Sequence, residues 1–362
     1  MASPRLSKAK PQTILLVLVV AVGLHGLLLG YPFWRLGQWL ELPEAILALM
    51  VVVILLSQLL CRWPLRQVRS TLARSIKQLL EVPLAVSPIL LLLVLAAEGG
   101  LALVWVDRSD VGFMILGVLG CVLPVGAFIA WRPVIKTLSL QNPKLAKALH
   151  IVQITDVHIG SRSPRFLTRL VKKINKIDPE ALMITGDFID QTGIDARALA
   201  PLKTLSMPVF FVIGNHERYE DLEAILAGVK ACGVNVLRNR GVSLRDDVQI
   251  VGVDDSDDPT QLKRVLPGID TPNRGFKVLL YHRPTGLETA AERGFDLTLS
   301  GHTHNGQVFP FNVLVKRQFP KIKGLYRTYD CDHYVSPGTG TWGPVFRLGS
   351  LSEITSIHIT PG

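Results

Sequence analysis

The segment from Leu149 to Gly160 constrains the fold of this 362-residue chain more than any other. It begins as a short apolar run rich in β-branched residues, which is typical of a buried strand. It ends in Asp156 and His158, two potential metal ligands separated by one residue. Side chains at positions i and i+2 of an extended chain point to the same side, so a carboxylate oxygen and an imidazole nitrogen can converge on one ion. The segment therefore predicts a buried strand that leads into a metal site.

Four apolar runs precede this segment. Hydrophobic residues make up 48% of the chain and the mean hydropathy is +0.34, which is too apolar for an ordinary soluble enzyme. A helix that crosses the hydrocarbon layer needs about 20 residues. The runs are Thr13–Gly30, Ala45–Leu60, Val82–Val106 and Gly112–Trp131. A cleaved signal peptide could explain the first run alone but not three more, so we expect about four transmembrane helices within residues 1–148.

The basic residues predict how this membrane region is oriented. Residues 1–148 carry 14 Lys and Arg against 6 Asp and Glu, whereas residues 149–362 carry 25 against 23. The basic residues gather before the first run, after the second and after the fourth, and the two other loops hold only Arg35 and Arg108. The positive-inside rule then places the C-terminal part on the cytoplasmic side. If one run lies only at the interface, this orientation depends on Arg132–Lys147 alone.

The loop after the second run has a helical pattern of its own. Its apolar positions are Leu65, Val68, Leu72, Ile76 and Leu79, and the basic positions between them are Arg66, Arg69, Arg74 and Lys77. This pattern predicts an amphipathic helix on an anionic leaflet, and a helix packed against the soluble part is an equal alternative. His25 and Glu98 are ionisable residues inside apolar runs, which makes them candidates for function. Each is alone in its run, so we do not expect a transport role.

The second half of the chain, residues 149–362, alternates strands with helices and predicts an α/β layered domain. Its near-neutral charge argues against a nucleic-acid partner, which would need a basic face. The four cysteines, Cys61, Cys121, Cys232 and Cys331, form neither a zinc-finger spacing nor a disulfide framework.

Seven potential metal ligands follow five separate strands of this domain. They are Asp156, His158, Asp187, Asn215, His282, His302 and His304. In α/β sheets, sites form at the carboxyl ends of the strands. Oxygen and imidazole ligands without thiolate suit manganese, iron or zinc, with manganese favoured. Seven groups are too many for one ion with an open position, and they suit two ions that share a bridging carboxylate.

Each of these residues also has a simpler structural interpretation. Asp187 could cap the next helix, and Asn215 could stabilise a turn. These interpretations do not explain why five strands each end in a ligand-type residue, so we favour the metal site. His150, His333 and His358 lack such a context and receive no role.

The order of the motifs resembles that of the calcineurin-like metallophosphoesterase superfamily. The matching blocks are Asp156-Val157-His158, Gly186-Asp187, Gly214-Asn215-His216-Glu217, His282 and Gly301-His302-Thr303-His304. The resemblance spans residues 149–340, and membrane-anchored bacterial members of the family are similar in layout. It implies a four-layer sandwich, with two mixed β-sheets inside and helices outside, in residues 149–362.

The resemblance also implies a role for each site residue. The first ion would be held by Asp156, His158 and His304, and the second by Asn215, His282 and His302, with Asp187 bridging. His216 matches the family's histidine that is not a ligand and that assists departure of the leaving oxygen, and Asn215 would also orient the phosphate. Asp190 resembles the carboxylate that orients this histidine, although a turn-capping role is equally plausible.

We therefore expect an integral membrane protein, of the bacterial inner membrane, whose phosphoesterase domain faces the cytoplasm. A metal-bridged hydroxide would hydrolyse a phosphodiester or pyrophosphate bond. A site beside the bilayer favours a lipid-linked substrate, and the resemblance extends to enzymes that act on a nucleotide-activated diacylglucosamine. The alternatives are a phosphatase or phosphodiesterase with a soluble substrate and a membrane sensor that uses metal only for structure. The sequence leaves the oligomeric state open.

Overall fold

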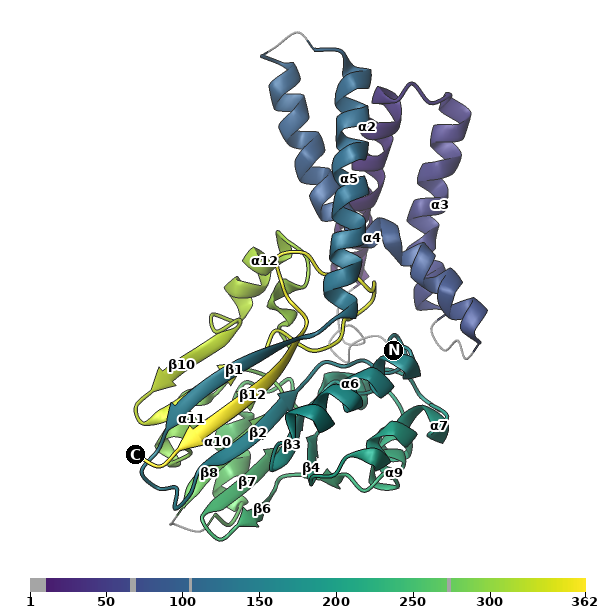
Figure 1. Ribbon diagram of the computed structural model, residues 1–362. Coiled ribbons are helices and arrows are strands. Elements are labelled where there is room, and N and C mark those ends of the chain that lie inside the picture. The colour runs from purple at the N-terminus through teal and green to yellow at the C-terminus, as the bar shows by residue number, and fades with distance from the viewer. Residues whose placement is uncertain (1–10, 66–69, 104–105, 272–274) are drawn as a thin grey trace. The chain divides into compact units, whose positions relative to one another are not determined.

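The computed structural model describes residues 11–65, 70–103, 106–271 and 275–362. The chain divides into two compact units, Met1–Pro124 and Val125–Gly362, and each is described by itself (Figure 1).

The first unit is helical. It contains α1 (Pro11–His25), a π-helical segment η1 (Gly26–Gly30), α2 (Tyr31–Trp39), α3 (Glu44–Arg62), α4 (Thr71–Leu101) and most of α5 (Arg108–Trp131). Four helical stretches are long and apolar enough to cross a membrane, namely Leu18–Trp39, Glu44–Arg62, Leu72–Leu101 and Arg108–Trp131. This agrees with the expected four helices, although the first stretch ends nine residues later than the apolar run because the helix continues through α2.

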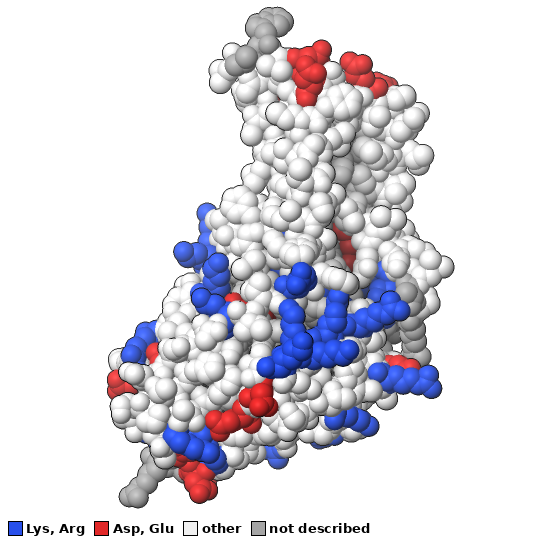
Figure 2. All heavy atoms as spheres, viewed as in Figure 1, with Lys and Arg blue, Asp and Glu red and all other residues white. Residues whose placement is uncertain are grey.

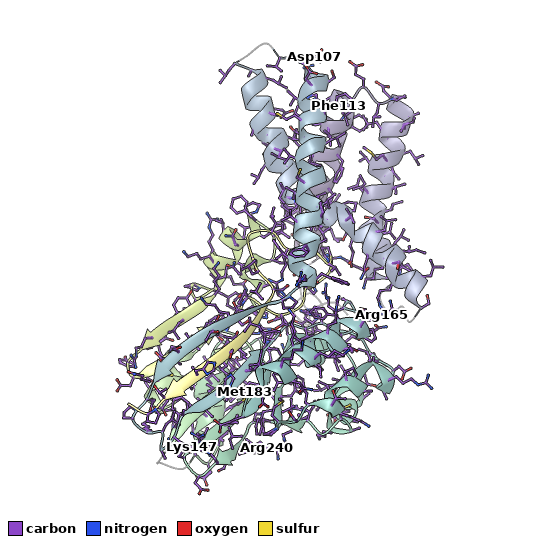
Figure 3. All side chains as sticks on the ribbon, in the orientation of Figure 1. Asp107, Phe113, Lys147, Arg165, Met183 and Arg240 are labelled. Atoms are coloured by element: carbon purple, nitrogen blue, oxygen red, sulfur yellow. The ribbon has the colours of Figure 1, made fainter. Side chains whose placement is uncertain are left out.

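The helices of this unit pack around a small core and expose apolar side chains outward. Trp39 of α2, Leu90 and Val94 of α4, and Ile115 of α5 are buried together. Phe113 of α5, labelled in Figure 3, is 63% exposed. Exposed apolar side chains of this size are typical of lipid-facing helices and costly in water.

The basic segment after the second span is partly described. Arg66, Val68 and Arg69 lie outside the described residues. From Thr71 the chain is helical, with the Ser70 hydroxyl accepting a hydrogen bond from the Ala73 amide at 3.1 Å. This part and the third span form the single helix α4, which continues through Pro83 and Pro88.

The two ionisable residues inside the apolar runs have partners within the bundle. Glu98 accepts hydrogen bonds from the Tyr31 hydroxyl and, at 2.5 Å, from Nε of Arg35. His25 Nε2 lies 3.1 Å from the carbonyl oxygen of Leu55. These contacts give both residues a structural explanation.

The second unit contains two six-stranded sheets. The order of the first is β1 (Val134–Gln141), β12 (Glu353–Thr360), β2 (Leu149–Ile154), β3 (Ala181–Thr185), β4 (Val209–Val212) and β5 (Asn235–Val236). The order of the second is β10 (Gly324–Thr328), β11 (Cys331–Val335), β9 (Leu297–Ser300), β8 (Phe276–Tyr281), β7 (Val248–Val253) and β6 (Arg240–Arg245). Each sheet mixes parallel and antiparallel pairs, as expected.

Alternation along the strands builds the layers. On β3, Leu182 and Ile184 belong to a core shared with the helices, whereas Ala181 and Met183 belong to a core between the two sheets. Successive strand residues point to opposite faces, so each apolar strand supplies both cores. Met183 is labelled in the sheet layer of Figure 3.

Helices cover both outer faces of this sandwich. The first face carries α6 (Pro164–Ile177), α7 (Ala196–Leu199), η2 (Ala200–Thr204) and α9 (Leu222–Lys230). The second face carries α10 (Gln261–Val265), η3 (Leu266–Gly268) and α11 (Leu287–Glu292). The other helical segments are α8 (Asn215–Tyr219), η4 (His304–Gly306) and α12 (Phe311–Gln318). The predicted four-layer arrangement is therefore confirmed.

The last turns of α5 belong to the second unit. The Arg347 amide donates to the Gly126 carbonyl oxygen at 3.1 Å, and Arg162 Nη2 donates to the Ala130 carbonyl oxygen at 2.9 Å. Strand β1 follows directly and pairs in parallel with β12. This strand was not expected from the sequence. It lies before the predicted domain boundary between residues 148 and 149, and that boundary stays a prediction.

Candidate metal centre

Five parallel-strand ends place the seven predicted ligands at one edge of the sandwich. Asp156 and His158 follow β2, Asp187 follows β3, and Asn215 follows β4. From the second sheet, His282 follows β8, and both His302 and His304 follow β9. Hydrogen bonds join the two sheets here, from Gln153 Nε2 to the Ser300 carbonyl oxygen at 3.0 Å and from His282 Nδ1 to the Thr185 carbonyl oxygen at 2.8 Å.

The backbone at this edge is strained. Left-handed φ angles of 53°, 56°, 49°, 71° and 49° occur at Asp156, His158, Asp187, His302 and His304. Such angles are uncommon for residues other than glycine, and they persist only where surrounding contacts enforce them. Here the Asp156 amide donates to the Gly186 carbonyl oxygen at 3.0 Å, and the His158 amide donates to the Asp187 carbonyl oxygen at 3.1 Å. Conformational strain that is held in this way is a mark of functional sites.

Two clusters of ligand atoms result. In the first, His304 Nε2 lies 3.3 Å from Asp156 Oδ1 and 3.2 Å from His158 Nε2. In the second, His282 Nε2 lies 3.2 Å from Asp187 Oδ2 and 3.3 Å from His302 Nδ1. Within each cluster the possible ligand atoms lie within 4.8 Å of one another.

A third group contains His158, Asp190 and His216, and it joins two of the three predicted catalytic residues, Asp190 and His216, to the first cluster. Asp190 Oδ2 lies 3.5 Å from His158 Nδ1 and accepts a hydrogen bond from the Ser161 hydroxyl at 2.6 Å. His216 Nε2 lies 4.0 Å from Asp187 Oδ2, and its ring meets that of His158 edge-on at 4.7 Å. Asp190 therefore contacts His158, while its predicted orienting of His216 stays a prediction.

Asn215 and Gly214 complete the approach to Asp187. The side-chain oxygen Oδ1 of Asn215 is buried and has no hydrogen-bond partner among the described residues. A Cβ atom on Gly214 would lie 2.2 Å from Asp187 Oδ1, so only glycine allows the two loops to come this close. The His216 amide donates to Asp187 Oδ1 at 2.8 Å and fixes the carboxylate.

The geometry of these groups fits bound cations. In each cluster two imidazole nitrogens lie 3.2 or 3.3 Å apart, with a carboxylate oxygen beside them. His282 donates its Nδ1 proton to the Thr185 carbonyl oxygen, so its Nε2 carries a lone pair when the ring is neutral. A divalent cation would satisfy these nitrogens and the unpartnered Asn215 oxygen together.

The charges of the site support the same interpretation. Although burial raises the pKa of the Asp187 carboxyl, the imidazoles of His282, His216 and His158 outweigh burial and hold this pKa well below its usual range. Burial lowers the pKa of His304 to about 4, and burial together with the His282 charge lowers the pKa of His302 to about 3. By contrast, although burial lowers the pKa of His282, the Asp187 and Asp156 carboxylates outweigh burial and raise this pKa to about 10. Ionised carboxylates and neutral imidazoles are the protonation states that ligate metals, so a cation bound here would displace the proton from His282.

Glu217 is a functional residue that the sequence analysis quoted but did not assign. It is fully buried, and its carboxylate accepts hydrogen bonds from the backbone amides of Asp187, Phe188, Ile189 and Gly214 at 2.7–3.0 Å. These four bonds tie the loop after β3 to the loop after β4. Its neighbours His216 and Arg218 are partly exposed, so no apolar pattern marks Glu217, and the available signal was its place in the block Gly214-Asn215-His216-Glu217.

Replacing Glu217 with glutamine should destabilise the second unit and its metal site together. The amide group has a similar volume, but its NH₂ end would face backbone amides that now donate to an oxygen, and the loss of the charge weakens the remaining bonds. Burial and the Asp187 charge raise the pKa of Glu217 to about 7, so its charge is fully present only above that pH. There, hydrogen bonds to a charged group contribute about 1.5–3 kcal/mol each, and losing two of them should cost about 3 kcal/mol or more. Thermal or urea unfolding of Glu217→Gln beside Glu223→Gln, an acidic residue of α9, would measure it. A variant as stable as the wild type would show that these bonds are dispensable.

Buried ion pairs support the remaining ligand loops. Asp255, whose side chain is fully buried, accepts from Arg218 Nε at 3.0 Å and from Arg283 Nε at 2.7 Å. Arg218 and Arg283 belong to the segments that carry Asn215 and His282, so Asp255 fixes both segments. Sequence reasoning missed this residue because no motif marks it.

Comparison with known proteins agrees with the geometry. The model of the calcineurin-like phosphoesterase family matches residues 149–306. An uncharacterized metallophosphoesterase from Helicobacter pylori is 34% identical over 242 residues, covering 64% of this chain and 65% of the relative. A bovine transmembrane protein with a metallophosphoesterase domain is 32% identical over 280 residues, covering 69% of this chain and 62% of the relative. The chain thus spans less than two thirds of the length of these two relatives.

A third relative is matched over most of its length. An uncharacterized metallophosphoesterase from Aquifex aeolicus is 31% identical over 240 residues, which cover 62% of this chain and 91% of the relative. The family implies divalent metal ions in a binuclear site, as the paired clusters do. By both its sequence and its site, the chain belongs to the calcineurin-like phosphoesterase family.

Proposed function

We propose that this protein is a membrane-anchored, two-metal phosphoester hydrolase. The observation that carries the proposal is the pair of ligand clusters at adjoining strand ends, with Asp187 in one cluster and within 4.0 Å of His216. The functional domains are taken as residues 1–148 and 149–362. Basic residues before the first span and after the second and fourth favour a cytoplasmic catalytic domain, and bacterial relatives favour the inner membrane.

The proposed ligand sets follow the clusters. Asp156, His158 and His304 would hold one ion, and Asn215, His282 and His302 would hold the other. Asp187 has two carboxylate oxygens and would be shared between the two ions. Two divalent ions, with manganese favoured over iron or zinc, would supply an activated water and neutralise the charge of the phosphoryl group.

The chain's own residues do the rest of the chemistry. His216 is partly exposed and is available to protonate the departing oxygen. Asn215 orients the phosphate through its side-chain amide. Asp190 accepts from Ser161 and faces His158 Nδ1, so it holds that imidazole with Nε2 directed at His304.

An apolar rim beside the site favours a lipid-linked phosphodiester or pyrophosphate, such as a nucleotide-activated diacylglucosamine. Trp342 and Tyr219 are 50% and 55% exposed, and their rings lie 6.4 and 6.0 Å from that of His216. Val313 and Leu314 of α12 are also exposed, and α12 packs against η4, which begins at His304. Apolar side chains gathered beside a polar site suit the acyl part of a substrate.

Replacing Trp342 with alanine should raise KM for an acylated substrate and leave a soluble substrate unaffected. Burying a large apolar side chain against a ligand contributes about 1.5–3 kcal/mol, so the expected rise in KM is about 10- to 100-fold. Steady-state kinetics with acylated and non-acylated phosphodiesters would measure it. Tyr329→Ala, which removes an exposed aromatic ring from the turn between β10 and β11, is the matched control. Equal effects on both substrates would favour a soluble natural substrate.

The hydrolase itself is tested by turnover of bis-p-nitrophenyl phosphate by the purified protein, with manganese, iron or zinc added. We expect turnover that depends on the metal and disappears on chelation. A protein that binds two ions but turns over no phosphoester would instead be a metal-binding membrane sensor.

A further inference from the structure

We propose that a cationic pocket at the end of α5 binds the phosphate of an anionic phospholipid headgroup. The pocket has a volume of about 250 Å³ and lies between the end of α5 and the first turns of α6. Its surface is almost entirely apolar, and the residues that line it include Trp131, Phe166 and Leu170 together with three cations, Arg132, Arg169 and Lys173. This site is separate from the metal centre and does not depend on hydrolysis.

The aromatic and cationic groups of the pocket are already ordered. The guanidinium of Arg169 stacks over the Trp131 ring at 3.5 Å, and Lys173 Nζ donates to the Pro133 carbonyl oxygen at 2.7 Å. Stacking on an aromatic ring leaves the guanidinium edge free to donate to a phosphate. The two side chains are therefore held beside the cavity before any ligand arrives.

No acidic residue compensates the positive charge of α6. The helix carries five basic residues and no acidic one between Pro164 and Ile177, and none of these five forms an ion pair in the described part of the chain. The five are Arg165, Arg169, Lys172, Lys173 and Lys176. Figure 2 shows a dense group of Lys and Arg over this face, and Arg165 is labelled there in Figure 3.

A further cation lies behind the apolar wall. The Arg162 guanidinium is buried, stacks on Phe166 at 4.0 Å, and has no hydrogen-bond partner for Nε and Nη1 among the described residues. Burial, followed by the charges of Arg132 and Arg169, lowers the pKa of Lys173. The pocket thus concentrates like charges that an anion would neutralise.

The position of the pocket along the chain identifies the anion. The candidate span Arg108–Trp131 ends at the tryptophan that forms the pocket wall. Tryptophan is enriched where a span meets the headgroups, and basic residues just beyond it lie at the level of the lipid phosphates. Three cations around an aromatic wall at that level fit an anionic phospholipid better than a soluble anion.

The test compares the wild-type protein with two double variants, all of them full-length and in an uncharged detergent. Arg169→Gln/Lys173→Gln removes two of the three pocket charges, and Arg165→Gln/Lys172→Gln removes two charges from the same helix that do not line the pocket. The probes are dihexanoyl phosphatidylglycerol, dihexanoyl phosphatidylcholine and inorganic phosphate, and the readout is the thermal unfolding midpoint. We expect phosphatidylglycerol to raise the midpoint by about 5 °C in the wild type and in the second variant, and most of that rise to be lost in the first.

Comparing variants separates this pocket from any binding at the metal centre, which both variants retain. Arg169→Lys/Lys173→Arg keeps the charges and should restore the response, so a folding defect in the first variant is distinguishable from lost binding. The proposal is overturned if the two double variants respond alike. The rise that depends on the pocket is the difference between the midpoint rise of the wild type and that of Arg169→Gln/Lys173→Gln. The proposal is also overturned if this difference is as large with phosphatidylcholine or inorganic phosphate as with phosphatidylglycerol.

Discussion

Asp187→Asn should lower kcat on bis-p-nitrophenyl phosphate by about 10³-fold or more and reduce the bound metal below two ions per chain. The substitution keeps an oxygen that can accept from the His216 amide, which donates to Asp187 Oδ1 at 2.8 Å, so the local fold is preserved. It removes the negative charge that faces His282 Nε2 at 3.2 Å. A metal site supplies several kcal/mol of transition-state stabilisation, and each 1.36 kcal/mol corresponds to a factor of ten in rate.

The measurement pairs steady-state kinetics with elemental analysis of the purified protein. Asp221→Asn is the matched control, because Asp221 caps α9 away from the ligands and accepts from the Ala224 amide. We expect it to keep both ions and full activity. If Asp187→Asn retained two ions and near-normal turnover, Asp187 could not be the bridging ligand.

His216→Gln should lose activity but keep the metal, whereas Asp187→Asn should lose both. Its side chain is 21% exposed, whereas the Asp187 side chain is 3% exposed and the His158 and His282 side chains are fully buried. Removing a general acid costs about 10²- to 10⁴-fold in rate, and we expect that loss in kcat with little change in metal content.

His358→Gln provides the comparison for this variant. His358 is exposed on β12 and stacks on His150, with ring centroids 3.9 Å apart, and it belongs to neither ligand cluster. Loss of metal together with activity in His216→Gln would place His216 among the ligands. Unchanged kcat would remove it from the chemistry altogether.

The sequence predicts best those features that lie within one short segment, such as a strand and the metal-ligand residue that follows it. The predicted alternation of strands and helices after residue 149 is confirmed, and so is the four-layer class that the family resemblance implies. A strand and the ligand residue that follows it are local features, because both lie within a segment of about a dozen residues. The ligand roles and the domain boundary at residue 149 stay predictions that the experiments above address.

Features that depend on distant partners could not be predicted in the same way. Glu217 is explained only by four amides from two loops, and Asp255 only by two arginines 37 and 28 residues away. Strand β1 was missed because its partner β12 lies at the other end of the chain and its own face is largely exposed. Periodicity within a segment carries no information about such contacts.

The end of α5 has an evolutionary consequence. Gly126 and Ala130, four residues apart and hence on one face of the helix, are buried, and a Cβ at Gly126 would lie 2.1 Å from the Phe346 ring. Val125 and Phe128, on other faces, are exposed and apolar. Two selection pressures therefore act on the same two turns of α5. Any apolar side chain suffices at the outward positions 125 and 128, whereas the side chains at the inward positions 126 and 130 must stay small. Related chains should vary freely in apolar type at 125 and 128, while position 126 remains glycine and position 130 remains glycine or alanine.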